Sequence, residues 1–143
     1  HRVDLLESVG SLKLLQAVQA QAAKLDIVQE ILLEVNIGGE ESKSGVSPQE
    51  LPQLVRQCSE LDHVRLRGLM AIPPVAEGVG GNRNFFAKMY QLFVDIRTDL
   101  GDNGGQVNCL SMGMSGDFED AVAEGATLVR VGTALFGPRP PLH

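Results

Sequence analysis

Metal-binding residues are scarce in this sequence. The 143 residues include only two cysteines and three histidines, and no tryptophan. Cys58 and Cys109 stand far apart, without the C-x-x-C spacing of a zinc or redox motif, which favours two thiols in a reducing compartment. A zinc or di-iron centre requires a cluster of histidine, cysteine or carboxylate residues, and the sequence has none. We therefore predict no metal site.

Long apolar runs and basic clusters are also lacking. No segment approaches the roughly 20 apolar residues that a membrane helix needs, and no basic-apolar-small leader opens the chain. The formal net charge is -6 without a cluster of lysine or arginine, which argues against a nucleic-acid surface. We expect a cytoplasmic protein with no membrane or nucleic-acid partner, in which any phosphate site depends on local donors.

The residues that are present are typical of a globular domain, with 43% hydrophobic and 21% charged residues. Strand and helix patterns alternate strictly, which predicts parallel βαβ units and an α/β architecture. We expect strands at residues 1–7, 30–37, 64–72, 107–113 and 127–133, and helices at residues 11–25, 48–61, 84–100 and 118–125. This pattern fits either an open doubly wound sheet or a (β/α) barrel. Five strands are too few to close an eight-stranded barrel.

Two serines at the starts of helices have different surroundings. Ser47 begins S-P-Q-E, in which Ser47 and Glu50 form a capping box and Pro48 is the first helical residue. Ser115 lies between a strand and a helix, but Phe118, three residues later, cannot return the cap. Its hydroxyl and the amides after it remain available for an anion, and Gly113 and Gly116 would let the backbone approach a ligand. An ordinary N-cap at Ser115 is the alternative.

The segment TLVRVGTALFG (127–137) carries an arginine inside an apolar strand. Side chains alternate along a strand, so Leu128, Arg130 and Gly132 share one face and the two valines share the other. In a barrel, Arg130 would point into the mouth, and Gly132 and Thr133 would offer an amide and a hydroxyl one strand away from Ser115. The next residues would form a short helical turn, as in barrel phosphate sites. The alternative is an ion pair of Arg130 with Glu119 or Asp120.

Four segments in order resemble the family of pyridoxal phosphate homeostasis proteins, which bind pyridoxal 5′-phosphate (PLP) on a barrel of the alanine-racemase type. These segments are EESKSG (40–45), LRGLMAI (66–72), LSMGMSGDFEDAV (110–122) and VRVGTALFG (129–137). The resemblance covers nearly the whole chain. It implies an α/β fold of the (β/α)8 TIM-barrel type, within which residues 1–143 form a single partial barrel domain supplying about the last five β/α units.

The resemblance also implies the residues that bind the cofactor. Ser115 of the G-M-S motif would bind the phosphate, and Gly132 and Thr133 would bind it from the other side. Arg130 would point at the pyridine nitrogen, where a guanidinium cannot accept a proton and so keeps that nitrogen unprotonated. Three further residues would line the site: Met114, Met70 and Asn36.

One element of the family pattern is missing from these residues. In the family, the lysine that forms the Schiff base with PLP lies in the first strand of the barrel, in an S-K-T type motif, and no such motif occurs here. Lys43, in EESKSG, lies beside Glu40 and Glu41 and is expected to stay protonated and to anchor its loop. We therefore expect the N-terminal units with the Schiff-base lysine to be absent from this sequence, no covalent PLP attachment through that lysine, and no catalytic residue.

Three functions are consistent with this sequence. The leading expectation is a PLP-binding protein of vitamin B6 homeostasis that holds or carries PLP without robust turnover, as a monomer or weak dimer, with PLP-accepting apoenzymes as partners. The second is a PLP-dependent racemase-like enzyme, for which the single tyrosine, Tyr90, lies in a helix pattern rather than in a second domain. The third is a cofactor-free barrel that binds a phosphorylated metabolite through Ser115, Gly132 and Thr133.

Overall fold

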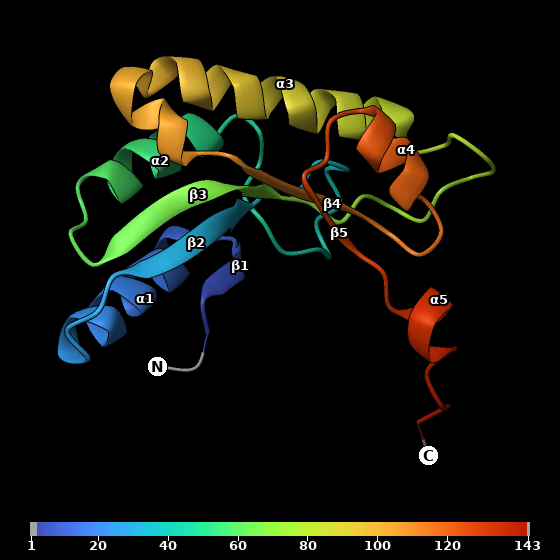
Figure 1. Ribbon diagram of the computed structural model, residues 1–143, viewed down its shortest axis with the longest axis horizontal. Coiled ribbons are helices and arrows are strands. Elements are labelled where there is room, and N and C mark those ends of the chain that lie inside the picture. The colour runs from blue at the N-terminus through green and yellow to red at the C-terminus, as the bar shows by residue number, and fades with distance from the viewer. Residues whose placement is uncertain (1–2, 143) are drawn as a thin grey trace.

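The computed structural model of the protein describes residues 3–142. In chain order, its elements are β1 (Leu5–Val9), α1 (Leu12–Lys24), β2 (Gln29–Glu34), α2 (Leu51–Ser59), β3 (Val64–Met70), α3 (Arg83–Asp99), the 3-10 helix η1 (Gly101–Gln106), β4 (Cys109–Met114), α4 (Phe118–Ala123), β5 (Leu128–Arg130) and α5 (Thr133–Phe136). The five strands form one parallel sheet in the order β1-β2-β3-β4-β5. The predicted alternation of strands and helices is therefore confirmed, and Figure 1 shows α5 and the chain after it lying apart from the layers of sheet and helices.

The boundaries differ from the predicted ones in places. The expected first strand includes residues 1 and 2, which lie outside the described residues. The capping box forms, because the Glu50 amide donates to Ser47 Oγ at 3.2 Å and the Ser47 amide donates to Glu50 Oε2 at 3.3 Å. Residues 48–50 are nevertheless a turn, and α2 begins only at Leu51. The last strand ends at Arg130, since Thr133 already starts α5.

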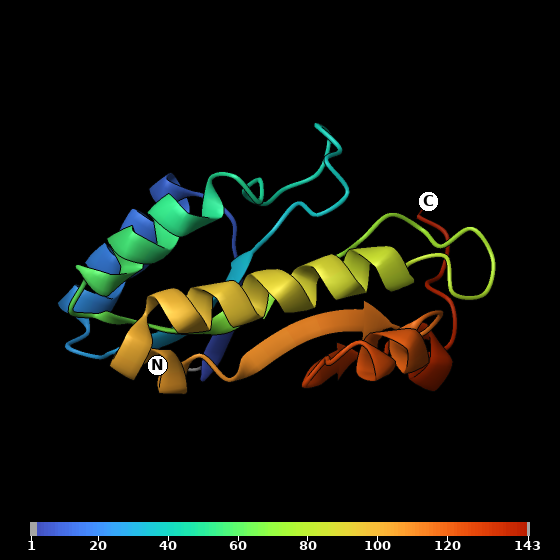
Figure 2. The same ribbon diagram turned by 90° about the horizontal axis from the view of Figure 1, so that it is seen from above.

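The strand order excludes the doubly wound alternative. Each strand pairs with the next one in the sequence, and right-handed crossovers that always step in one direction place every connecting helix on the same face of the sheet. Side chains of α1, α2, α3 and α4 accordingly join one apolar core with the outer face of the strands, including Leu15, Leu54, Phe86 and Ala121. Figure 2 shows α3 running along β4 in this layer. Of the two arrangements that the pattern left open, the doubly wound sheet is thus excluded, and a curved, singly wound sheet remains.

A hydrogen bond between two distant strands shows how strongly the sheet curves. Ser111 Oγ on β4 donates to Glu7 Oε1 on β1 at 2.6 Å, although β2 and β3 lie between these strands. In a flat sheet, three strand spacings would separate β1 and β4 by about 14 Å. The two side chains meet because they lie on the concave face, opposite the helices. The protein thus forms a parallel half-barrel.

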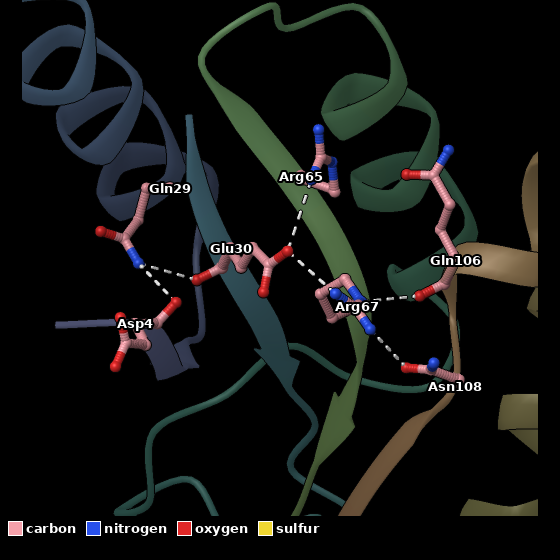
Figure 3. Close-up of polar contacts among 7 residues, drawn as sticks. All are labelled: Asp4, Gln29, Glu30, Arg65, Arg67, Gln106 and Asn108. Atoms are coloured by element: carbon pink, nitrogen blue, oxygen red, sulfur yellow. Dashed lines mark hydrogen bonds and ion pairs between the residues drawn. The ribbon is translucent and has the colours of Figure 1, made fainter. Parts of the chain in front are cut away.

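Charged side chains occupy the concave face near the amino ends of the strands (Figure 3). Glu30 Oε1 on β2 accepts hydrogen bonds from Arg67 Nη1 at 2.8 Å and Arg65 Nη1 at 3.4 Å, both on β3. Arg67 also donates to the Gln106 carbonyl at 2.9 Å and to Asn108 Oδ1 at 3.0 Å. These bonds join β2 and β3 to the end of η1 and to the residue before β4, which stabilises this end of the half-barrel.

The close approach of β3 to β4 requires a glycine, which gives a test of the fold. A Cβ at Gly68 would overlap the Cys109 carbonyl, so Gly68→Ala is expected to lower the free energy of unfolding by about 2 kcal/mol or more. A Cβ at Gly105 would meet no atom within 4 Å, and Gly105→Ala is the matched control, with a change within about 0.5 kcal/mol. Urea unfolding measures both, and equal stabilities would contradict this strand geometry.

Candidate functional site

A cavity lies at the carboxyl ends of β3, β4 and β5, where parallel α/β folds bind ligands. We call it the carboxyl-edge cavity. Its volume is about 1060 Å³. It is lined by Lys43, residues 72–76, 78 and 79, residues 114–117, residues 130–133, and residues 136, 137 and 139.

The pairing of β4 with β5 brings the predicted phosphate-binding residues together. Met114 on β4 is in register with Arg130 on β5, so the loops that follow both strands leave the sheet side by side. The Ala134 amide, in the first turn of α5, donates to Ser115 Oγ at 3.0 Å. Ser115, Gly132 and Thr133 therefore line one cavity, as the motif spacing predicted.

Backbone donors in these two loops are free. Within residues 3–142, no protein acceptor pairs with the amides of Ser115, Gly116, Gly132 and Thr133. A Cβ at Gly116 or Gly132 would meet no atom within 4 Å, so open space adjoins both residues. Unpaired amides with open space beside them are usual features of a backbone anion site.

Arg130 lies under this cavity with an incomplete set of partners. Its Nη2 donates to the Ala71 carbonyl at 2.8 Å, whereas its Nε is buried and has no partner within the described part of the chain. Burial lowers the pKa of the Arg130 guanidinium, and the carboxylates of Glu7, Glu34 and Asp117 oppose that shift. A buried N–H without an acceptor costs about 1–3 kcal/mol, so an acceptor from a bound ligand would relieve this cost.

The alternative partners of Arg130 are ruled out. Within residues 3–142, Arg130 forms no ion pair, and Asp120 is instead bonded to Arg83 Nε at 2.9 Å. Ser115 is also not an N-cap, because α4 begins at Phe118 and Asp117 occupies the N-cap position. Both of these competing interpretations were therefore wrong.

The charges around the cavity favour an anion. Its lining includes the cations Lys43, Arg130 and Arg139 and a single carboxylate, that of Asp117. This local excess of positive charge contrasts with the net charge of -6 for the whole chain. The positive charge is thus confined to the lining of this cavity and is not a property of the whole chain.

Met114 lines the carboxyl-edge cavity, but two other predicted residues do not. Met70 is 3% exposed at the end of β3, and the core positions of Leu69 and Ala71 on either side place it on the concave face. Asn36 Nδ2 donates to the Glu40 carbonyl at 2.7 Å, and Asn36 lines a second cavity of about 960 Å³. Lys43 lines both cavities and pairs with Glu40 at 3.6 Å.

Several residues of the cavity were missed by sequence reasoning. Arg139 follows the motif VRVGTALFG, Phe136 lies inside it without a predicted role, and the loop 73–79 was interpreted only as a connection. Gly113 was expected to make room for a ligand, but a Cβ there would lie 2.6 Å from the Ala121 Cβ. Its glycine is therefore explained by the packing of α4 on β4. No local sequence signal marks these assignments.

Two negative observations apply to residues 3–142. No group of three or more His, Cys, Asp or Glu side chains there is placed to hold a metal ion. No helix in the same range has the length and apolar character needed to cross a membrane.

Comparison with known proteins identifies the family. Residues 1–140 match the family described as alanine racemase, N-terminal domain. The chain belongs to this family. The parallel half-barrel is accordingly an alanine racemase N-terminal fold.

Within the alanine racemase N-terminal family, curated relatives carry a more specific name. The pyridoxal phosphate homeostasis protein of Aquifex aeolicus is 44% identical over 138 residues, which are 96% of this chain and 59% of the relative. PipY of Synechococcus elongatus, solved without PLP, is 34% identical with a TM-score of 0.83. The PLP-bound PipY structure is 33% identical with a TM-score of 0.74. Each PipY match covers 94% of this chain and 61% of PipY. The chain thus spans less than two thirds of these relatives.

The polar layer beneath the cavity gives a second prediction. Ser111 is fully buried, and its hydroxyl donates a hydrogen bond to the Glu7 carboxylate. Ser111→Ala removes this donor and is expected to lower the free energy of unfolding by about 1–3 kcal/mol. Ser8→Ala, at an exposed serine of β1, is the matched control. Thermal unfolding distinguishes the two variants, and an unchanged Ser111→Ala protein would refute the role of this bond.

Proposed function

We propose that this protein binds PLP in the carboxyl-edge cavity and acts in vitamin B6 homeostasis as a cytoplasmic holder or carrier of PLP. It passes PLP to accepting apoenzymes and has no robust turnover of its own. The proposal is supported most directly by the unpaired amides of four residues that line the same locally cationic cavity as Arg130: Ser115, Gly116, Gly132 and Thr133. The names of the relatives and the PLP-bound PipY structure agree with this ligand.

The residues of the cavity divide between the two ends of the cofactor. Ser115, Gly132 and Thr133 hold the phosphate, whose two negative charges suit backbone amides. Arg130 faces the pyridine nitrogen, which is an acceptor of the kind that its Nε lacks. PLP supplies an aldehyde and an electron-withdrawing ring, and the guanidinium limits the second property because it leaves the ring nitrogen unprotonated. Of the three further residues expected near the ring, Met114 borders it in this cavity, whereas Met70 and Asn36 lie outside the cavity lining.

We further propose that the half-barrel is part of a closed (β/α)8 barrel. Its strands are parallel and strongly curved, and β1 and β5 are the two edges of the sheet. Residues 1–143 would form one partial barrel domain containing about the last five β/α units. The position of the phosphate donors after the last two strands agrees with this order, since barrels often bind phosphate after strands seven and eight. The protein would be a monomer or weak dimer.

A racemase-like enzyme is the second candidate, and Tyr90 is not placed to serve it. Such an enzyme needs a second acid or base at the ring. Tyr90 lies on α3, and its ring packs against Gly125, on the helical layer rather than in the carboxyl-edge cavity. A measurable racemisation rate with an amino acid would favour the enzyme over the holder.

The phosphate role of Ser115 is tested with two ligands that lack the aldehyde and so cannot react with surface lysines. Wild-type protein should bind pyridoxine 5′-phosphate more tightly than pyridoxine in isothermal titration calorimetry. Ser115→Ala should weaken binding of the phosphate ester about tenfold, which corresponds to one hydrogen bond to a charged group. Binding of pyridoxine should not change.

Ser47 provides the matched control for this experiment. It also lies just before a helix, in the turn that precedes α2, but its hydroxyl belongs to the capping box with Glu50. Ser47→Ala should lower stability by about 1 kcal/mol without changing the preference for the phosphate ester. If the wild type and Ser115→Ala proteins prefer the phosphate ester over pyridoxine equally, the proposed site is contradicted.

A separate measurement tests the third candidate, a cofactor-free site for a phosphorylated metabolite. Such a protein would show no absorbance band of bound PLP.

Replacing Arg130 tests the other end of the cofactor. Arg130→Glu replaces the guanidinium donor at the ring nitrogen with a carboxylate. The carboxylate would favour protonation of that nitrogen. We expect weaker PLP binding and a shifted absorbance maximum of the bound cofactor, measured by spectrophotometric titration. An unchanged spectrum together with an unchanged affinity would remove Arg130 from the site.

A further inference from the structure

A buried asparagine connects the two loops that form the walls of the carboxyl-edge cavity. Asn82, the residue before α3, is 3% exposed. Its Nδ2 donates to the Pro74 carbonyl at 2.9 Å and to Asp117 Oδ2 at 2.8 Å. Both partners are acceptors only, so the amide nitrogen must face them. Pro74 and Asp117 line the cavity, whereas Asn82 does not.

The carboxylate of Asp117 needs an explanation at this place. It lies two residues after Ser115, and a negative charge beside a phosphate site opposes anion binding. Its two oxygens, however, are both occupied by donors of the protein. Oδ1 accepts from the Met114 amide at 2.8 Å, and Oδ2 accepts from Asn82. Asp117 thus holds the turn at residues 114–117 in shape, and Asn82 ties that turn to the loop after β3.

We propose that Asn82 is a positioning residue for the phosphate site: by bridging Pro74 and Asp117, it fixes the loop after β3 against the amides of Ser115 and Gly116 and thereby sets the preference for a phosphorylated ligand. This inference rests on the function proposed above. Loss of the bridge leaves the partly buried Pro74 carbonyl and one carboxylate oxygen of Asp117 without their donor. The turn then loses the geometry on which convergent amide donors depend.

The bridge is distinct from the other contact between the same elements. Arg83 Nε donates to Asp120 Oδ1 at 2.9 Å, but the side chain of Arg83 is 53% exposed. A solvent-exposed pair of this kind contributes little. Asn82 is buried and bonded to both loops, so the positional constraint comes from this residue.

The test compares pyridoxine 5′-phosphate with pyridoxine by calorimetry at constant ionic strength. Asn82→Ala removes no charge, and we expect it to lower the ratio of the two affinities by about fivefold or more, as the loss of one well-placed hydrogen bond predicts. The affinity for pyridoxine itself should remain within about twofold of the wild type. Asn84→Ala, at the exposed asparagine two residues later, is the matched control and should preserve the ratio.

A second variant keeps the test decisive if Asn82→Ala does not fold. Asn82→Ser is also uncharged, and its side chain is too short to reach both acceptors, so the same loss of the ratio is expected. A wild-type ratio in the folded variant would overturn the positioning role of Asn82. A wild-type protein that does not discriminate between the two ligands would instead overturn the proposed phosphate site.

Discussion

The register between β4 and β5 is the constraint on which the candidate site depends. Because Met114 is paired with Arg130, the chain leaves both strands at the same edge, and Ser115 reaches the amide of Ala134. A slip of one residue would turn Arg130 toward the helices and separate the two loops. The pairing of β4 with β5 thus places two motifs that are distant in the sequence beside the same cavity.

Curvature of the sheet adds the second half of the arrangement. The concave face carries Glu7, Glu34, Ser111 and Arg130, side chains that a flat sheet would leave apart. Arg130 is half-buried there, near carboxylates but in no ion pair within the described residues. A guanidinium whose buried Nε–H has no acceptor lowers the stability of the fold, but that N–H can donate to a ligand. Binding of a ligand therefore explains the position of Arg130 better than packing within the protein does.

Local sequence rules predicted much of this structure. The capping box at Ser47, the short helix after Gly132 and the face shared by Arg130 and Gly132 follow from spacing over a few residues. The face on which the helices pack depends on the direction of each crossover, which residue patterns do not encode, so two arrangements stayed open. The bridge from Asn82 to Asp117 spans 35 positions in the sequence and lacks any periodic signal. Asn36 and Met70 were assigned from the family resemblance, and the structure places neither at the carboxyl-edge cavity.

The central claim is that a phosphate group binds between the loops after β4 and β5. NMR measurement of amide chemical shifts during titration with pyridoxine 5′-phosphate tests it most directly, because each unpaired amide gives its own signal. The amides of Ser115, Gly116, Gly132 and Thr133 should shift together in a single saturable process, while those around Asn36 and Gln49 should stay in place. Shifts confined to the second cavity, or no saturable shift at these four amides, would contradict the account.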